Sequence, residues 1–241
     1  MKVNEVLKRA FLPRLCILCG DVIDYDLDEP FCDKCRVEWL KNLDIMCDDC
    51  GFDCENCICL PEKVREINHS LASFGVFYTP SEMTPANRIV YRLKRDYKLE
   101  IIRFCADVIF KRAISLCEKY KIDYTDYLVT FPPRKYDSVI KYGYDHAELL
   151  AREFAKRMGL EVVVAFENVG ETEQKTLTRA QRFKNAASSF ELVEGLKLKK
   201  KGMFLIDDVM TSGATLNVCA RMLYHVGAKS VIPITFAKDT K

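Results

Sequence analysis

The stretch that decides the fold of this chain reads Phe204-Leu205-Ile206-Asp207-Asp208-Val209-Met210-Thr211-Ser212-Gly213-Ala214-Thr215. The apolar run Met203 to Ile206 predicts a strand buried on both faces. Residues 211–215 add hydroxyls, a glycine and backbone N–H groups just before a helix, where unpaired donors and the helix dipole favour a phosphate. Two carboxylates directly upstream suit ribose hydroxyls or a hydrated Mg²⁺ beside it. Together these features predict a site for a phosphorylated ribose.

The flanks of this stretch predict a strand, loop, helix and strand in that order. Apolar residues recur at helical spacing over 215–226, Gly227 is placed as a helix stop, and residues 230–237 form a second strand-like run. A parallel crossover is expected, with ligands beyond the carboxyl ends of the strands, where residues 207–215 fall. The alternative is an ordinary strand end followed by an ordinary turn. The order of strand, acid pair and Thr-Ser-Gly-x-Thr turn favours the ligand site.

This segment resembles the signature of type I phosphoribosyltransferases, which bind 5-phosphoribosyl-1-pyrophosphate (PRPP) with Mg²⁺. The resemblance implies that Asp207 and Asp208 face the ribose diol. It implies that the 5′-phosphate lies in the loop that follows, so that the PRPP-binding residues are Asp207, Asp208, Val209, Met210, Thr211, Ser212, Gly213, Ala214 and Thr215. Ser212 stands where the family usually has threonine, and it keeps the hydroxyl donor.

Residues upstream of this segment read as alternating strands and helices. Strands are expected at 74–79, 126–131 and 160–166, and helices at 86–99, 101–120 and 144–158. This order predicts an α/β fold, with a type I phosphoribosyltransferase-like sheet flanked by helices. The chain has 241 residues, enough for a full core and a small satellite. We expect a Cys-rich zinc-ribbon-like module at 1–65 and a phosphoribosyltransferase-like domain at 66–241.

Nine of the 12 cysteines lie between residues 16 and 59 and include four CxxC pairs. Two CxxC pairs separated by a short loop have the spacing of a tetrahedral zinc site, because each pair wraps one edge of the ion. The first site is expected from Cys16, Cys19, Cys32 and Cys35. A second is expected from Cys47, Cys50 and two of Cys54, Cys57 and Cys59, a choice that the spacing leaves open. One or two structural zinc ions are therefore predicted.

A disulfide-rich secreted module is the competing interpretation of these cysteines, and it requires an oxidising compartment. The first fifteen residues intersperse basic and apolar positions without the continuous apolar core of a signal peptide, and no apolar run has the length of a membrane span. We therefore expect a cytoplasmic protein with reduced thiols and no membrane insertion. The remaining cysteines, Cys105, Cys117 and Cys219, are expected as inert residues on apolar helix faces.

The net charge of the chain changes sign between the Cys-rich part and the rest. Residues 16–59 hold twelve acidic and three basic side chains, a net charge of −9, and the other residues hold 34 bases and 23 acids, a net charge of +11. Zinc-bound thiolates make the first part more negative still. The Cys-rich part is therefore expected to be structural, while the basic remainder attracts a polyanion such as PRPP or single-stranded nucleic acid.

Further stretches resemble the ComF family, whose members are associated with bacterial competence and DNA uptake. Residues 89–94 are similar to the family helix that ends in a lysine, here Lys94, and Phe131-Pro132-Pro133-Arg134 matches its proline-rich strand end in part. Gln174, Leu177, Arg179, Arg182, Asn185 and Phe190 fit its Gln/Arg-rich pattern. Residues 142–147 depart from the family's "R-G-F-N-Q-A", since an arginine is lost and Asp145 is gained. Lys141 or Arg134 are candidates to replace that arginine.

The resemblance implies displacement of pyrophosphate from ribose C1 by a nitrogen nucleophile, with residues that position the substrates and stabilise charge. Asp207 and Asp208 would hold ribose and metal, and Arg134 and Lys94 the leaving pyrophosphate. Gln174, Arg179, Arg182 and Asn185 would form a lid, or alternatively a solvated surface helix. His146 is a candidate base without a partner in the sequence, and His225 reads as a helix-end residue.

Two other classes of function remain open. The chain is alternatively a non-catalytic adaptor that binds single-stranded DNA on a phosphoribosyltransferase scaffold, with other competence proteins as partners. The basic remainder favours this reading, while the core-like spacing of the aromatic residues disfavours it. A zinc-held protein-interaction module is the third class, and it predicts neither ligand. The acceptor nucleophile, turnover and oligomeric state are not determined by the sequence.

Overall fold

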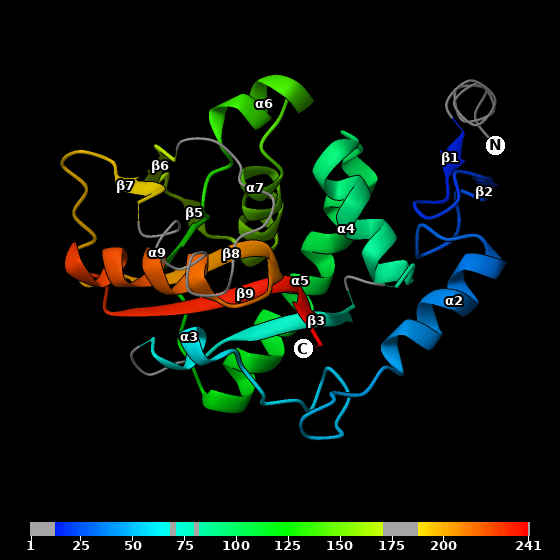
Figure 1. Ribbon diagram of the computed structural model, residues 1–241, viewed down its shortest axis with the longest axis horizontal. Helices are drawn as coiled ribbons and strands as arrows, with labels where there is room; N and C mark the ends of the chain where they lie inside the picture. Colours follow the sequence, from blue (N-terminus) through cyan, green and yellow to red (C-terminus); the bar gives the residue numbers. More distant parts are fainter. Residues whose placement is uncertain (1–12, 68–70, 80–81, 171–187, 241) are drawn as a thin grey trace.

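A parallel five-stranded sheet forms the centre of the computed structural model, which describes residues 13–67, 71–79, 82–170 and 188–240 (Figure 1). Its spatial order is β3-β9-β8-β4-β5. The strands span Ser73–Tyr78 (β3), Ser230–Asp239 (β9), Gly202–Met210 (β8), Tyr127–Thr130 (β4) and Glu161–Val162 (β5). Every neighbouring pair is parallel, so the carboxyl ends of all five strands lie at one edge.

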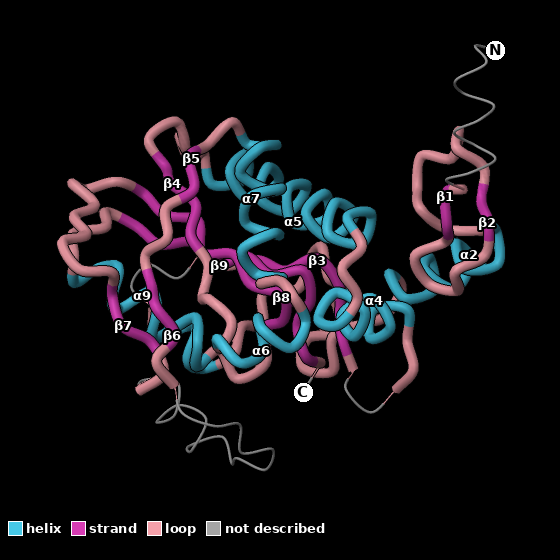
Figure 2. Tube along the Cα trace, turned by 90° about the horizontal axis from the view of Figure 1, so that it is seen from above, coloured by secondary structure: helices cyan, strands magenta, loops and turns pink. Residues whose placement is uncertain are grey.

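Helices cover both faces of this sheet, as Figures 1 and 2 show. One face carries α5 (Leu99–Tyr120) and α7 (His146–Met158), and the other carries α9 (Ala214–His225) and the short α3 (Glu62–Arg65). Successive side chains of a strand alternate between faces. Phe204 and Ile206 accordingly join the core under α5 and α7, whereas Met203 and Leu205 join the core under α9. The sequence prediction of an α/β fold with helices on both faces is confirmed.

The strand order reverses between β8 and β4, and the carboxyl ends of these two strands lie next to the predicted ligand site. The crossover from β8 through α9 leads to β9 on one side of β8, while the crossover from β4 through α6 (Tyr136–Tyr142) and α7 leads to β5 on the other. The two crossovers run over opposite faces, which separates the segments that follow β4 and β8. In open α/β sheets such a switch point is where ligands bind.

Strand β8 is longer than the sequence pattern indicates. The apolar run predicts residues 203–206, but the strand continues through both aspartates to Met210, because β9 pairs with it as far as the Met210 and Lys238 register. On its other side β4 ends opposite Leu205. The end of β8 therefore projects beyond one neighbour while it stays paired to the other. The acid pair lies inside the strand and not after it.

Capping residues set the ends of the helices near the site. Asp145 caps α7 by accepting hydrogen bonds from the backbone N–H groups of Ala147 and Glu148 at 2.9 and 3.3 Å. Helix α4 (Pro85–Arg95) begins after Thr84, which accepts from the Asn87 N–H at 3.3 Å. The helices expected at 86–99 and 144–158 are thus shorter than predicted, while α5 begins two residues before the expected helix at 101–120.

The strand expected at 160–166 is instead divided. Residues 161–162 join the main sheet as β5, and β6 (Phe166–Asn168) pairs with β7 (Phe190–Leu192) in a separate antiparallel ribbon. This ribbon places Asn168 and Phe190 beside the carboxyl edge of the sheet. In the part of the chain that the structure describes, no helix combines the length and apolarity needed to cross a bilayer.

The Cys-rich region packs against the main core. It contains the strands β1 (Arg14–Leu15) and β2 (Val22–Ile23) and the helix α2 (Asp33–Leu43). The Trp39 ring lies 5.6 Å from that of Phe31 and 5.2 Å from that of Phe104 on α5. These rings belong to the same apolar core as the sheet. The domain boundary near residue 65 stays a prediction.

Candidate functional site

The loop between β8 and α9 forms one wall of a pocket of about 250 Å³. Gly213 has a φ of 74°, a left-handed conformation that favours glycine, and α9 begins at the next residue. The N-terminal turn of α9, whose first N–H groups have no acceptor within the helix, therefore faces the pocket. The residues around this pocket are Lys135, Asn168, Ser189, Phe190, Asp207, Val209, Met210, Thr211, Ser212, Gly213, Ala214, Thr215 and Leu216.

Helix α3 packs against the loop between β8 and α9. A Cβ atom at Gly213 would collide with the Val64 side chain, so the loop approaches α3 more closely than any other residue type allows. The Asn217 amide donates to the Lys63 carbonyl oxygen at 2.7 Å and joins α9 to α3 at the same level. The Ala214 N–H also donates to the Ser212 hydroxyl at 3.4 Å. The loop is therefore held in a fixed shape before any ligand arrives.

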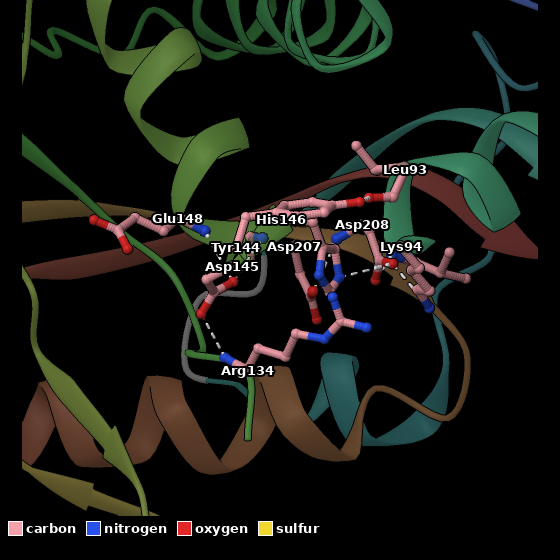
Figure 3. A network of polar contacts seen from close by, with 11 residues as sticks. Leu93, Lys94, Arg134, Tyr144, Asp145, His146, Glu148, Asp207 and Asp208 are labelled. Atoms are coloured by element: carbon pink, nitrogen blue, oxygen red, sulfur yellow. Dashed lines mark hydrogen bonds and ion pairs between the residues drawn. The ribbon is translucent and has the colours of Figure 1, made fainter. Parts of the chain in front are cut away.

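Asp207 and Asp208 are adjacent near the end of β8 and have different neighbours, although their carboxyl groups lie close enough for a side-chain hydrogen bond. Asp207 is half-buried and lines the pocket with the loop. Asp208 is buried on the α7 side, where its Oδ2 lies 2.8 Å from Lys94 Nζ and 3.3 Å from His146 Nε2. Figure 3 shows Lys94 and His146 reaching it from two helices (Figure 3). Of the two acids, Asp207 lines the pocket, and the predicted contact of both acids with the ribose stays a prediction.

The two carboxyl groups have opposite electrostatic environments. Burial and the adjacent negative charge of Asp208 raise the pKa of Asp207 well above its usual range. Burial acts in the same direction on Asp208, but the Lys94 charge and the His146 hydrogen bond outweigh it, so the pKa of Asp208 is lowered. The Asp208 charge likewise raises the pKa of Lys94 against the effect of desolvation. The ionised form is thus favoured at Asp208, while a nearby cation would favour it at Asp207.

The stretch that departs from the ComF pattern has structural roles. The Asp145 carboxylate caps α7 and also accepts the backbone N–H of Arg134 at 2.6 Å. The Tyr144 hydroxyl donates to the Leu93 carbonyl oxygen at 2.8 Å and ties this stretch to the end of α4 (Figure 3). The acid gained here therefore orders the segment after β4. It does not face an anion in the pocket.

Arg134 and Lys94, the two cations expected at the pyrophosphate, do not line the pocket. The Arg134 guanidinium carbon lies 4.3 Å from the centre of the Tyr142 ring, and one guanidinium nitrogen is buried without a partner in the described residues. Lys94 is paired with Asp208. Lys135 lines the pocket instead, one residue after the expected arginine. The proposed lid residues Gln174, Arg179, Arg182 and Asn185 lie outside the described residues.

Sequence reasoning missed Lys135, Asn168 and Ser189 in the pocket lining. Asn168 is the last residue of β6, and Ser189 directly precedes β7, with which β6 pairs. The Asn168 amide donates to the Pro133 carbonyl oxygen at 2.8 Å and fixes this region to the segment after β4. The position of Lys135 immediately after the proline-rich strand end was the one available signal.

The histidines differ in their surroundings. His146 begins α7 and has Asp208 as its partner, which the sequence did not reveal. Its ring is buried, and its Nδ1 has no hydrogen-bond partner in the described part of the chain. His225 ends α9, as expected for a residue that interacts with the helix dipole.

The first cysteine cluster comprises Cys16, Cys19, Cys32 and Cys35, whose sulfur atoms all lie within 4.8 Å of one another. The Sγ atoms of Cys19 and Cys32 are 3.7 Å apart. A tetrahedral zinc ion with bonds of about 2.3 Å requires sulfur separations of about 3.8 Å. The four thiols therefore fit zinc, and their positions agree with the predicted first site.

The second cluster consists of Cys47, Cys50, Cys57 and Cys59. The Sγ atoms of Cys50 and Cys57 are 3.8 Å apart, which again matches a tetrahedron around zinc. Cys54, which was among the expected ligands, lies apart from this group, and its Sγ accepts a hydrogen bond from Arg112 Nη2 at 3.1 Å. The structure thus selects Cys57 and Cys59 from the three candidates. Two Cys-rich clusters are able to hold zinc.

The parallel sheet, with a phosphate-type loop between β8 and α9, agrees with the phosphoribosyltransferase-like fold that the sequence predicts. The family model described as "Phosphoribosyl transferase domain" matches residues 139–241. Over 93% of its length the chain is 23% identical to "Competence protein ComFC" of Bacillus subtilis (strain 168), of which the match covers 95%. These findings support a ComF-family protein with a phosphoribosyltransferase fold, as the sequence motifs predict.

Solved structures show a weaker likeness. Adenine phosphoribosyltransferase from Saccharomyces cerevisiae is 16% identical, with 73% of this chain and 88% of that one covered and a TM-score of 0.39. For the allosteric regulatory enzyme of purine biosynthesis the identity is 14% and the TM-score 0.38, with 63% of this chain covered. This chain spans 30% of the length of that enzyme.

Proposed function

We propose that this protein binds PRPP together with Mg²⁺ in the pocket between β8 and α9. The observation that carries the proposal is the preformed loop 211–215 at the N-terminus of α9, with the Asp207 carboxylate on the same wall. The loop offers hydroxyl and N–H donors for the 5′-phosphate. Asp207 is placed to accept from ribose hydroxyls. Its raised pKa means that it gains most from a nearby cation.

Magnesium suits this site because carboxylate and phosphate oxygens are its preferred ligands. Asp207 and the phosphates of PRPP itself would hold the ion, which would neutralise charge that develops on the leaving pyrophosphate. Lys135 lines the pocket on the β4 side and is the cation best placed for that group. Arg134 supports the same segment through its backbone hydrogen bond to Asp145.

The reaction that we propose transfers the phosphoribosyl group to a nitrogen nucleophile. The bond from C1 to the pyrophosphate oxygen breaks, and the oxygen keeps the electron pair. A bond from C1 to the incoming nitrogen forms, and that nitrogen releases a proton. The pocket residues contribute by orienting the ribose and stabilising pyrophosphate, which are the main demands of an oxocarbenium-like transition state.

Calorimetric titration with PRPP, with and without Mg²⁺, tests the binding assignment. Binding is expected only with the metal, and Asp207→Asn should weaken it by at least tenfold. Asp126→Asn is the matched control, since Asp126 is an exposed acid whose side chain pairs with Lys201 far from the pocket. Equal PRPP binding by the wild type and Asp207→Asn would reject the assignment. A melting temperature that rises with PRPP and Mg²⁺ together is the independent readout.

A role in DNA uptake, a cytoplasmic location and zinc in both cysteine clusters complete the proposal. The similarity to a competence protein supports the first, and the abundance of thiols in metal-type clusters supports the other two. Other competence proteins are the expected partners. Zinc analysis of the purified protein should return two equivalents per chain.

The second candidate function is a non-catalytic adaptor for single-stranded DNA. A groove of about 530 Å³ along α4 favours it, because basic side chains line it together with Tyr78 and Tyr91. The Arg95 guanidinium carbon lies 4.1 Å from the centre of the Tyr91 ring, and Arg88 and Arg92 line the same groove. Such binding should weaken steeply with salt and survive Asp207→Asn, whereas PRPP binding should not. An interaction module held by zinc would bind neither ligand.

A further inference from the structure

Three residues other than glycine have a positive φ in the part of the chain that the structure describes, and all three are lysines. Lys199 and Lys200 have φ values of 46° and 61°, and Lys121 has a φ of 53°. Left-handed backbone is unfavourable for a residue with a Cβ atom, and glycine, asparagine and aspartate are the usual residues there. These three positions therefore carry lysine against the local preference of the backbone.

Lys199 and Lys200 are the two central residues of a tight turn. The Lys201 N–H donates to the Leu198 carbonyl oxygen at 2.9 Å and closes the turn, and two consecutive positive φ values are typical of type I′. Asn-Gly, Asp-Gly and Gly-Gly are preferred in such turns. The surroundings fix its shape, since Leu198 is buried and the Lys200 N–H donates to the Gly227 carbonyl oxygen at 3.0 Å. Strained backbone of this kind often marks a functional position, so the retention of two lysines indicates a role for their side chains.

The turn lies at the amino edge of the sheet, opposite the edge that bears the ligand loop. It leads directly into β8, whose first residue Gly202 pairs with Ser230 of β9. The Lys229 N–H donates to the Lys201 carbonyl oxygen at 2.8 Å, so the segments before β8 and β9 are neighbours. Lys121 follows α5 on the connection to β4, the strand beside β8. The amino edge thus gathers lysines from three connections.

The positive charge of this edge is largely uncompensated. Residues 197–201 contain four lysines and no acid, and only one of the four, Lys201, forms an ion pair among the described residues, with Asp126 at 2.8 Å. The two central lysines of the turn are exposed. No large apolar side chain is exposed in residues 193–201 or 226–229. Without apolar anchors for a lipid surface or aromatic platforms for unstacked bases, the lysines suit closely spaced phosphates on a rigid backbone.

We propose that this amino-edge surface binds the phosphate backbone of duplex nucleic acid without regard to sequence. Its lysines are Lys121, Lys197, Lys199, Lys200 and Lys229. Phosphate contacts position a protein on the duplex but carry no sequence information. The inference does not rest on PRPP binding, because the surface and the ligand loop lie at opposite edges of the sheet. It is also distinct from the groove along α4, where tyrosine rings favour a single strand.

Fluorescence anisotropy with a short labelled duplex of mixed sequence tests this surface in the full chain. Wild type is compared with Lys199→Gln plus Lys200→Gln, which removes two charges and keeps a Cβ atom at both turn positions. We expect binding to weaken about tenfold, and the slope of log affinity against log salt to shrink by about two, because each phosphate contact contributes about 0.9 to it. Lys199→Arg plus Lys200→Arg keeps both charges and should bind like wild type.

A second pair of substitutions, Lys199→Asn plus Lys200→Gly, separates the loss of charge from any loss of folding. These are the preferred residues of the turn, so we expect a higher melting temperature together with the same loss of duplex binding. The charge-matched control is Lys41→Gln plus Lys111→Gln, at exposed lysines of α2 and α5. It should bind the duplex like wild type.

Unchanged duplex binding in both uncharged turn variants would overturn the proposal, as would an equal loss in the Lys41 and Lys111 control. Wild-type protein that binds only a single strand, or only vesicles of anionic phospholipid, would assign the charge to another class of partner and overturn it too. Calorimetric PRPP binding should be the same in all variants. A failure of this surface and a failure of the ligand site are therefore distinguishable.

Discussion

Asp207 and Asp208 are consecutive residues whose carboxylates have different partners, since Asp207 lines the loop pocket and Asp208 is paired with Lys94. We therefore expect their substitution by asparagine to have different consequences. Asp207→Asn should abolish most PRPP binding and leave the free energy of unfolding unchanged or higher, because it removes a carboxylate that is costly to ionise. Calorimetry and urea unfolding measure the two effects.

Asp208→Asn should instead destabilise the fold, because Lys94 and His146 lose their carboxylate partner. Removing one member of a fully buried pair costs about 3–5 kcal/mol, and exposed pairs contribute under about 1 kcal/mol. Lys94 is partly exposed, so we expect a loss of about 2 kcal/mol. Adding Lys94→Met to Asp208→Asn should recover part of it, and fully additive losses would contradict the pairing.

The close approach of Gly213 to Val64 makes the ligand loop sensitive to a single methyl group. Gly213→Ala imposes a left-handed φ on alanine and a collision with Val64, so we expect a loss of more than about 2 kcal/mol and no PRPP binding. Gly195→Ala is the matched control: Gly195 has a φ of 77°, and its Cβ would meet no atom within 4 Å. That variant should lose about 1 kcal/mol and keep PRPP binding.

The Val64→Ala variant distinguishes the two causes of the stability loss expected in Gly213→Ala, which are the collision with Val64 and the backbone strain. Combined with Gly213→Ala, it should restore part of the stability by removing the collision while the backbone strain remains. Urea unfolding of the single and double variants measures this coupling. Equal losses in Gly213→Ala and Gly195→Ala would show that α3 does not restrain the loop.

Local sequence patterns were sufficient for the loop, the positions of β3 and β4, and the grouping of the first four cysteines. Those features depend on neighbours in the chain: alternation along β8, glycine before α9, and the CxxC spacing. The length of β8 was not predictable from its apolar run, because its last residues are held by pairing with β9. Tertiary pairing therefore decided where this strand ends.

Residues brought together from distant segments could not be predicted in the same way. Asn168 and Ser189 reach the pocket through a separate ribbon, and Lys94 reaches Asp208 from α4. His146 reaches the same carboxylate from the start of α7, which no local pattern in the sequence indicates.

The spacing of the cysteines did not determine which of Cys54, Cys57 and Cys59 join the second cluster, but the structure gives a direct prediction. Cys54→Ser should retain both zinc ions, because Cys54 contacts Arg112 and lies outside the cluster. Cys57→Ser and Cys59→Ser should each lose one zinc ion and lower the melting temperature, since metal binding contributes folding free energy. Zinc analysis of the purified variants measures this. If Cys54→Ser loses a zinc ion and Cys59→Ser retains both, then Cys54 is the zinc ligand and Cys59 is not.

Tyr144 couples the helix that bears Lys94 to the start of α7, and its ionisation predicts a dependence on pH. Burial raises the pKa of Tyr144 to about 12, above the ordinary value of about 10. The stability that this group contributes is complete below pH 10 and is lost as the pH rises toward 12, because the unfolded chain releases the proton first. Tyr144→Phe removes both this dependence and the hydrogen bond to Leu93, worth about 1 kcal/mol.

Urea unfolding at pH 8 and pH 11 therefore distinguishes Tyr144 from an exposed tyrosine. The stability advantage of wild type over Tyr144→Phe should shrink by about 1 kcal/mol between the two pH values, since one unit of separation corresponds to about 1.4 kcal/mol. The Tyr136→Phe variant should have the same free energy of unfolding as wild type at both pH values, because 73% of the surface of Tyr136 is exposed. If Tyr144→Phe also follows wild type, the hydroxyl titrates as in the unfolded chain, and it does not hold α4 against the segment before α7.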